Sequence, residues 1–367
     1  MHYCEIKSID DLKEKLHKQE RIEWCAFQNM DFTSLTDDSL TFRYYNCLFM
    51  GCTFSKQMRI QIDKSCLIFS PITVPYNCFH TELYTPESLY EGFCMENPES
   101  YSTCYDSRIY SHYLNKGKTA TDIKETLARS LHDHSISNAL HDLLAHYDEK
   151  HIVGIMGGHG LLRTDSAYRQ ITAISKKLTE MGYLMVSGGG PGAMEATHLG
   201  AWMAGRDAKE LSAALDILSQ APEYTHPLWL STAFQVRTHY PQQRYISLGV
   251  PTWLYGHEPA TPFATHIAKY FENAIREDGI LTMAMGGIIY SPGSAGTMQE
   301  IFQDAAQNHY KTCGACSPMV FLGSEHYGRT VPVYPFLEDL AARGIYKNLR
   351  LHLTDSAGDA IETICRF

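Results

Sequence analysis

The stretches YLMVSGGGPGAMEA (183–196) and GGIIYSPGSAGTMQE (286–300) decide the fold of this chain. Each is an apolar run that ends in glycines and leads into a helix-like pattern. Glycine lets the backbone take positive φ and approach a ligand closely. The N–H groups at the start of a helix then favour an anion. Each stretch predicts a strand–turn–helix unit whose turn holds a phosphate, with a purely structural glycine turn as the alternative.

Strand-like and helix-like segments alternate from His151 to the C-terminus, which is typical of a parallel sheet with helices on both faces. The other apolar runs are HIVGIMG, RYISLGV, SPMVFLG and LRLHLTD. Helices are expected over about 164–181, from Pro191 onward, across 264–284, and through TMQEIFQDAAQNHY. The sequence predicts a Rossmann-like α/β domain over 151–367, with both glycine turns at strand carboxyl ends, where open sheets bind ligands.

Residues 1–105 are rich in Cys, Tyr and Phe and are expected to form a smaller, β-rich domain. Side chains five residues apart form two series: Phe42, Cys47 and Cys52, and Tyr44, Phe49 and Phe54. The segment NCLFMGCTF resembles pentapeptide repeats, which build a square β-solenoid with such side chains inside. An irregular β-rich domain with chance spacing is the alternative. Residues 106–150 are interpreted as a helical connector, with two helices over about 118–149.

The composition of the chain indicates which partners and which cellular compartment to expect. With 31 basic and 41 acidic residues the net charge is −10, which argues against nucleic acid as the main partner. No apolar run reaches about 18 residues, so no membrane span is expected, and the N-terminus lacks the apolar core of a signal peptide. The 11 cysteines lie in apolar patterns, which favours reduced thiols in a cytoplasmic protein.

No metal and no organic cofactor is expected. Cys313 and Cys316 form one C-x-x-C pair without the second pair of a zinc site. Pro259 follows His257-Glu258 and excludes the helical H-E-x-x-H geometry. The segment around these three residues is instead expected to be a loop beside the ligand pocket.

Three polar side chains near the expected turns are candidates for contacts with the ligand. Thr297 can offer its hydroxyl to a phosphate oxygen, and Glu300 lies three residues on, on the same side of the helix. A carboxylate near a helix start should stay ionised at neutral pH; the alternative for Glu300 is a surface residue that complements the helix dipole. His159, preceded by Gly157 after the first strand, is either a contact for base or ribose or a loop histidine.

The pair SGGGPGAMEA and PGSAGTMQE resembles the LOG family, which includes cytokinin-activating phosphoribohydrolases and bacterial nucleotide 5′-monophosphate nucleosidases. The resemblance covers about 151–367 and implies Glu300 as catalytic glutamate and Arg276 as catalytic arginine. In two departures, Ser294 replaces a glycine of the family motif and Arg276 lies about one residue upstream of the usual spacing. The positions assigned to phosphate and nucleotide are Gly157, His159, Gly188, Gly189, Gly190, Gly192, Met194, Gly293, Ser294, Gly296 and Thr297.

The resemblance implies hydrolysis of the N-glycosidic bond of a nucleoside 5′-monophosphate, giving free base and ribose 5-phosphate. Glu300 would stabilise an oxocarbenium-like ribose and activate water, while Arg276 would hold the phosphate or orient Glu300. The partner is then a small-molecule nucleotide, and a homodimer or dimer-based oligomer is expected. A nucleotide-sensing module without turnover is the alternative. Lysine decarboxylation, a frequent label for this family, finds no support in the glycine turns.

Overall fold

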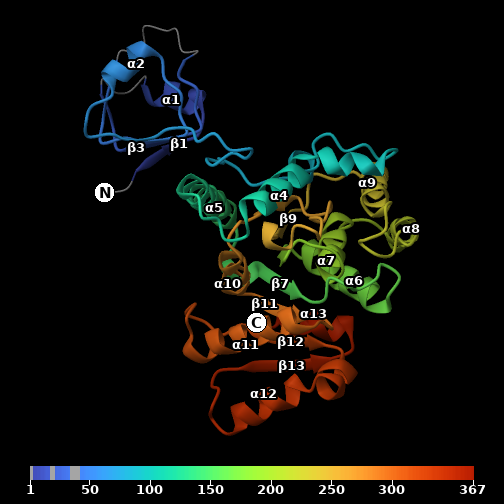
Figure 1. The fold of residues 1–367 in the computed structure, drawn as a ribbon. Helices are drawn as coiled ribbons and strands as arrows, with labels where there is room; N and C mark the ends of the chain where they lie inside the picture. Colours follow the sequence, from blue (N-terminus) through green and yellow to red (C-terminus); the bar gives the residue numbers. More distant parts are fainter. Residues whose placement is uncertain (1–2, 17–20, 34–41) are drawn as a thin grey trace. The chain divides into compact units, whose positions relative to one another are not determined.

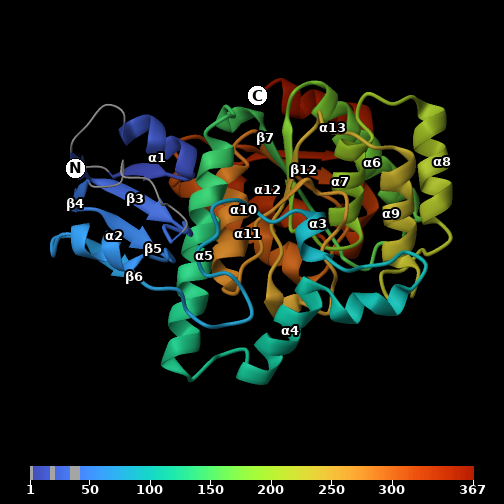
Figure 2. The same ribbon diagram turned by 90° about the horizontal axis from the view of Figure 1, so that it is seen from above.

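The computed structural model describes residues 3–16, 21–33 and 42–367. The chain forms two compact units, Met1–Leu83 with Leu114–His141 and Tyr84–Tyr113 with Asp142–Phe367. They are called the first and the second unit below, and each can be followed by its colours in Figure 1 and Figure 2. Among the described residues, no helix combines the length and apolar character that a membrane span requires.

The second unit contains a seven-stranded parallel sheet, with strand order β10-β9-β8-β7-β11-β12-β13. The strand order changes direction between β7 and β11, which is the topological switch point of a doubly wound sheet. The predicted Rossmann-like α/β fold is confirmed. The strands are β7 (Ile152–Met156), β8 (Leu184–Ser187), β9 (Ser247–Gly249), β10 (His266–Ile267), β11 (Gly287–Tyr290), β12 (Pro318–Leu322) and β13 (Arg350–Thr354).

Helices cover both faces of this sheet, as Figure 2 shows. Helix α6 packs against α7 and α13, while α10 packs against α11. Between sheet and helices lies a core of fully buried side chains that includes Val153, Met185 and Ile289. The helices are α3 (Pro86–Leu89), α4 (Tyr105–Lys116), α6 (Ser166–Glu180), α7 (Ala193–Trp202), α8 (Ala208–Leu218), α9 (Trp229–His239), α10 (Asn273–Met283), α11 (Ala295–Tyr310), α12 (Val333–Ala342) and α13 (Ala357–Cys365).

The stretch 264–284 is not the single helix that its sequence suggests. Its start forms the edge strand β10, where Ile267 exchanges backbone hydrogen bonds with Tyr84. Helix α10 begins only at Asn273, after Glu272 accepts a hydrogen bond from the backbone N–H of Ala274. This short strand pairs with β9 and with the distant Tyr84, and both contacts are invisible to local periodicity.

A β-rich domain was predicted over residues 1–105, and within the first unit the described residues up to Phe69 form two small parallel sheets. Strands β1 (Cys4–Ile6), β3 (Cys25–Gln28), β5 (Leu48–Met50) and β6 (Leu67–Phe69) form one parallel sheet, and β2 (Arg21–Glu23) pairs in parallel with β4 (Arg43–Tyr45). Phe27 stacks on Phe49 at 4.8 Å between ring centroids. The two series of side chains spaced by five residues lie in the core of this unit. Four of their members are buried, namely Tyr44, Cys47, Phe49 and Cys52, and the other two, Phe42 and Phe54, pack against this core. This geometry suits the pentapeptide interpretation, which stays a prediction.

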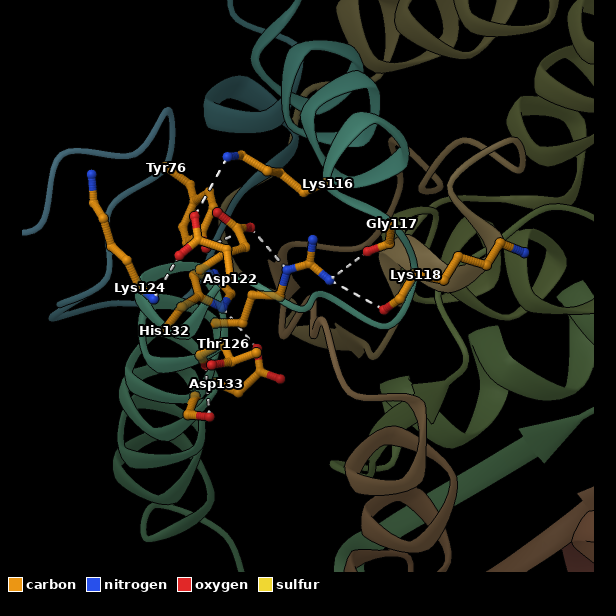
Figure 3. Close-up of polar contacts among 12 residues, drawn as sticks. Tyr76, Lys116, Gly117, Lys118, Asp122, Lys124, Thr126, His132 and Asp133 are labelled. Carbon is orange, nitrogen blue, oxygen red and sulfur yellow. Dashed lines mark hydrogen bonds and ion pairs between the residues drawn. The ribbon is translucent and has the colours of Figure 1, made fainter.

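Helix α5 (Ile123–Leu144) is one helix of 22 residues, where two were expected. Its buried Arg129 binds Glu125 through Nε at 2.9 Å and the carbonyl oxygens of Gly117 and Lys118 through Nη1 (Figure 3). The hydroxyl of Tyr76 also donates to Glu125, at 3.2 Å. These contacts attach most of α5 to the first unit, whereas Tyr84–Tyr113 belongs to the second. The compact units therefore divide the chain elsewhere than the predicted boundaries at 105 and 150.

Candidate functional site

A cavity of about 350 Å³ lies in the second unit at the carboxyl ends of β7, β8 and β11. It is therefore at the switch point, where open α/β sheets bind their ligands. Its walls come from the loop after β7, the turn after β8, the loop after β9, helix α10 and the start of α11. The predicted site residues among its lining are Gly157, His159, Gly188, Met194, Arg276, Ser294, Gly296, Thr297 and Glu300.

The start of helix α11 forms one wall of the cavity. The first intrahelical hydrogen bond runs from the N–H of Met298 to the carbonyl of Ser294, at 3.0 Å. The N–H groups of Ala295, Gly296 and Thr297 precede it, and all three residues line the cavity. Together with the positive end of the helix dipole, these groups suit an anion such as a phosphate.

Of two neighbouring residues in this turn, Ser294 lines the cavity and Gly293 does not. Ser294 has φ −112°, a value open to any residue, so a serine at this position causes no backbone strain. Gly293 lies outside the cavity lining. A Cβ added there would be 2.1 Å from Oγ1 of Thr297, so this glycine makes room for the threonine side chain.

Three glycines of the first turn also lie outside the lining and serve packing. Gly192 has φ +68°, and a Cβ on it would be 2.4 Å from the carbonyl oxygen of Gly158. That carbonyl accepts the N–H of Ala193, so a protein group, and not a ligand, occupies this donor of α7. Gly189, at φ +70°, packs against the segment after β9, and Gly190 donates its N–H to Sδ of Met194 at 3.4 Å.

Gly188 lines the cavity and supports Arg276. A Cβ at this position would be 2.2 Å from Nη2 of Arg276. We expect Gly188→Ala to displace the guanidinium and to lower the rate of the reaction that we propose below about tenfold or more, because misplacing a binding group by about 1 Å is costly. Gly160→Ala is the matched control, since a Cβ there meets no atom within 4 Å. Equal rates for the two variants would show that this placement of Arg276 is unimportant.

Arg276 on α10 and Glu300 on α11 meet within the cavity. Nη1 of Arg276 lies 3.8 Å from Oε1 of Glu300, and the two side chains are 13% and 12% exposed. Nε of Arg276 donates to the carbonyl of Val250 at 3.3 Å, which fixes the guanidinium from the sheet side. The one-residue displacement of Arg276 in the sequence therefore does not keep it from the site.

Burial raises the pKa of Glu300 to about 7. The positive charge of Arg276 lowers this pKa, and the negative charge of Glu277 raises it further. This corrects the expectation of a carboxylate fully ionised at neutral pH. Glu300 lies in the second turn of α11, and the helix-start effect falls off within the first turn, so desolvation outweighs it. A carboxyl group with a pKa near 7 is suited to exchange protons during catalysis.

The cavity is also lined by polar residues that belong to no recognised sequence motif. Glu277 follows Arg276 and accepts hydrogen bonds from Asn273 at 2.6 Å and from Gln299 at 2.8 Å, which joins α10 to α11. Tyr255 and Glu258 line the cavity from the loop after β9, in the segment expected beside the pocket. Proximity to His257 was the one sequence signal for Glu258.

No family model matches the chain, and no curated protein matches it either. Among solved structures, it is similar to the molybdenum cofactor binding protein of the phototrophic bacterium Rippkaea orientalis, with TM-score 0.38, 13% identity, and coverage of 59% of this chain and 95% of that chain. It is also similar to the molybdenum cofactor carrier protein of Chlamydomonas reinhardtii, with TM-score 0.36, 16% identity, and coverage of 59% and 96%.

Proposed function

We propose that the second unit binds a nucleoside 5′-monophosphate and hydrolyses its N-glycosidic bond to free base and ribose 5-phosphate. One observation carries the proposal. The start of α11, Arg276 and Glu300 converge on a single cavity at the switch point of the sheet. The cavity volume of about 350 Å³ is within the usual range for small-molecule sites. The resemblance of both glycine turns to the LOG family supports the same assignment.

The phosphate would be held by the N–H groups of Ala295, Gly296 and Thr297, remote from the reacting carbon. Binding energy from that group helps to position the ribose for reaction. As the C1′–N bond breaks, its electron pair leaves with the base and the ribose becomes oxocarbenium-like. The Glu300 carboxylate stabilises this cation and takes a proton from the water that attacks C1′. The departed base takes up one proton, directly or through solvent, which restores the carboxylate and gives the free base. Arg276 lies beside Glu300 and can bind the phosphate or hold the carboxylate in place.

Incubation of the purified protein with AMP, GMP, CMP, UMP and IMP, followed by chromatography, tests the proposal. We expect free base to appear with at least one nucleotide. Arg276→Ala should weaken nucleotide affinity, measured by calorimetry, and turnover as well. The matched control is Arg329→Ala, which removes an arginine that is 81% exposed. Tight binding without any release of base would contradict hydrolysis and leave a nucleotide-binding module.

A further inference from the structure

Glu258 is a second shielded carboxylate in the cavity, outside both glycine turns. Its side chain is 14% exposed, and Oε1 lies 3.5 Å from Nδ1 of His159 and 3.8 Å from Nε2 of His257. Oε2 lies 3.6 Å from the position that a Cβ on Gly190 would take. The carboxylate therefore stands over the turn after β8, beside the loop after β7.

The loop that carries Glu258 is anchored on both sides. Before it, Trp253 is fully buried and donates from Nε1 to Asp106 at 3.1 Å. Gly256 lies so close to Tyr110 that a Cβ would be 2.2 Å from the ring. After it, the N–H of Thr261 donates to the carbonyl of Gly189 at 2.8 Å. A carboxylate on such a loop is held in place before a ligand arrives, which favours selective binding.

Glu258 and the anion-binding start of α11 lie at opposite ends of the cavity, because they follow different strands of the sheet. The turn at the start of α11 follows β11, whereas Glu258 follows β9, and the order β9-β8-β7-β11 places two strands between them. A carboxylate repels a phosphate and accepts hydrogen bonds from N–H groups. With the phosphate at α11 and the ribose at Glu300, the base would extend toward Glu258. Tyr255, which also lines the cavity, offers a ring on which a base can stack.

We propose that Glu258 reads the base and makes the cavity selective for guanine nucleotides. This inference rests on the proposed nucleotide site. Guanine presents two adjacent donors, N1–H and the 2-amino group, which match the two oxygens of one carboxylate. Hypoxanthine offers N1–H alone. The amino groups of adenine and cytosine lie beside a ring acceptor, and the N3–H of uracil lies between two carbonyl oxygens, so a carboxylate meets repulsion at each of these bases.

The test compares GMP, IMP and AMP on the full-length protein and on Glu258→Gln. The wild type should favour GMP over AMP in kcat/KM by about tenfold to a hundredfold, as expected for a bidentate contact. Glu258→Gln should lose most of that preference through a fall in the value for GMP, with AMP changed by about threefold or less. Glu325→Gln, at a glutamate that is 74% exposed, is the matched control and should keep the wild-type ranking.

Calorimetry on the Glu300→Gln background measures the same base preference without turnover. A GMP preference that depends on Glu258 supports base reading, even if no nucleotide is cleaved and the proposed hydrolysis fails. Equal affinity for the three nucleotides, or an equal loss for all of them in Glu258→Gln, would overturn base reading while leaving hydrolysis intact. The absence of binding by any nucleotide would overturn both proposals.

Discussion

Glu300→Gln should lower the rate of base release about a hundredfold or more while nucleotide binding survives. The change keeps the shape of the side chain and removes the negative charge that faces the developing oxocarbenium. The proposed phosphate contacts lie one turn earlier on α11, at Ala295, Gly296 and Thr297, and should be unaffected. Glu300→Asp keeps the charge on a shorter side chain and should retain intermediate activity. Base release at the wild-type rate by Glu300→Gln would contradict the catalytic assignment.

The pH profile provides a second measurement of the same role. Burial raises the pKa of Glu300 to about 7. Because the proposed mechanism needs the carboxylate form, kcat/KM should rise with pH through about 7 and then level off. Glu300→Gln should lack this step. An activity that falls as pH rises through the same range would assign the protonated form, and hence general-acid catalysis, to this residue.

Loss of activity in Glu300→Gln should not reflect unfolding, and the direction of the pKa shift shows why. The folded-state pKa of about 7 lies above the ordinary value of 4.5, so the folded protein binds this proton more tightly than the unfolded chain. The resulting contribution to stability is present below about pH 4.5 and is lost as pH rises through about 7. Above that pH the charged form is buried at a cost, and glutamine should be tolerated at least as well.

The sequence predicted the second unit well because its evidence is local. An apolar run, a glycine turn and a helix start recur in order, and such units assemble into a parallel sheet in few ways. The edge strand β10 was missed because it has two residues and depends on its contacts with β9 and Tyr84. The hydrogen bonds from Arg129 on α5 to the carbonyls of Gly117 and Lys118 were also missed, because no sequence pattern marks them.

The candidate site was predictable only in part. Arg276 and Glu300 were predicted from the resemblance to the LOG family, and both line the cavity. The sequence of the glycine turns could not show which glycine lies beside a ligand. Gly188 lines the cavity and Gly192 packs against Gly158, but nothing in the sequence distinguishes the two positions. The protonation of Glu300 depends on burial, which composition does not reveal. Glu258 gains its position from the anchors at Trp253 and Thr261, and no motif marks it.

Glu195, which follows the glycine turn after β8, has a structural role, and its loss is expected to have a large effect on stability. It is fully buried on α7, where Oε2 accepts from Nε of Arg163 at 2.8 Å and Oε1 accepts from Nη2 at 2.5 Å. The hydroxyl of Tyr168 also donates to Oε2, at 2.9 Å. The other donors of Arg163 are taken by Thr232 and by two backbone carbonyls. Removal of the carboxylate would leave the guanidinium buried without its counter-ion.

Glu195→Ala should therefore lower the free energy of unfolding of the second unit by about 3–5 kcal/mol. Denaturant unfolding followed by tryptophan fluorescence can measure this, because Trp202, Trp229 and Trp253 all lie in the second unit. Glu362→Ala is the matched control. It removes an Arg–Glu pair whose glutamate is 57% exposed, and it should cost about 0.5 kcal/mol or less. Replacing both Arg163 and Glu195 by apolar residues should restore part of the loss, since neither buried charge then remains unpaired. If Glu195→Ala unfolded at the same denaturant concentration as Glu362→Ala, the ion pair would contribute nothing to the stability of this unit.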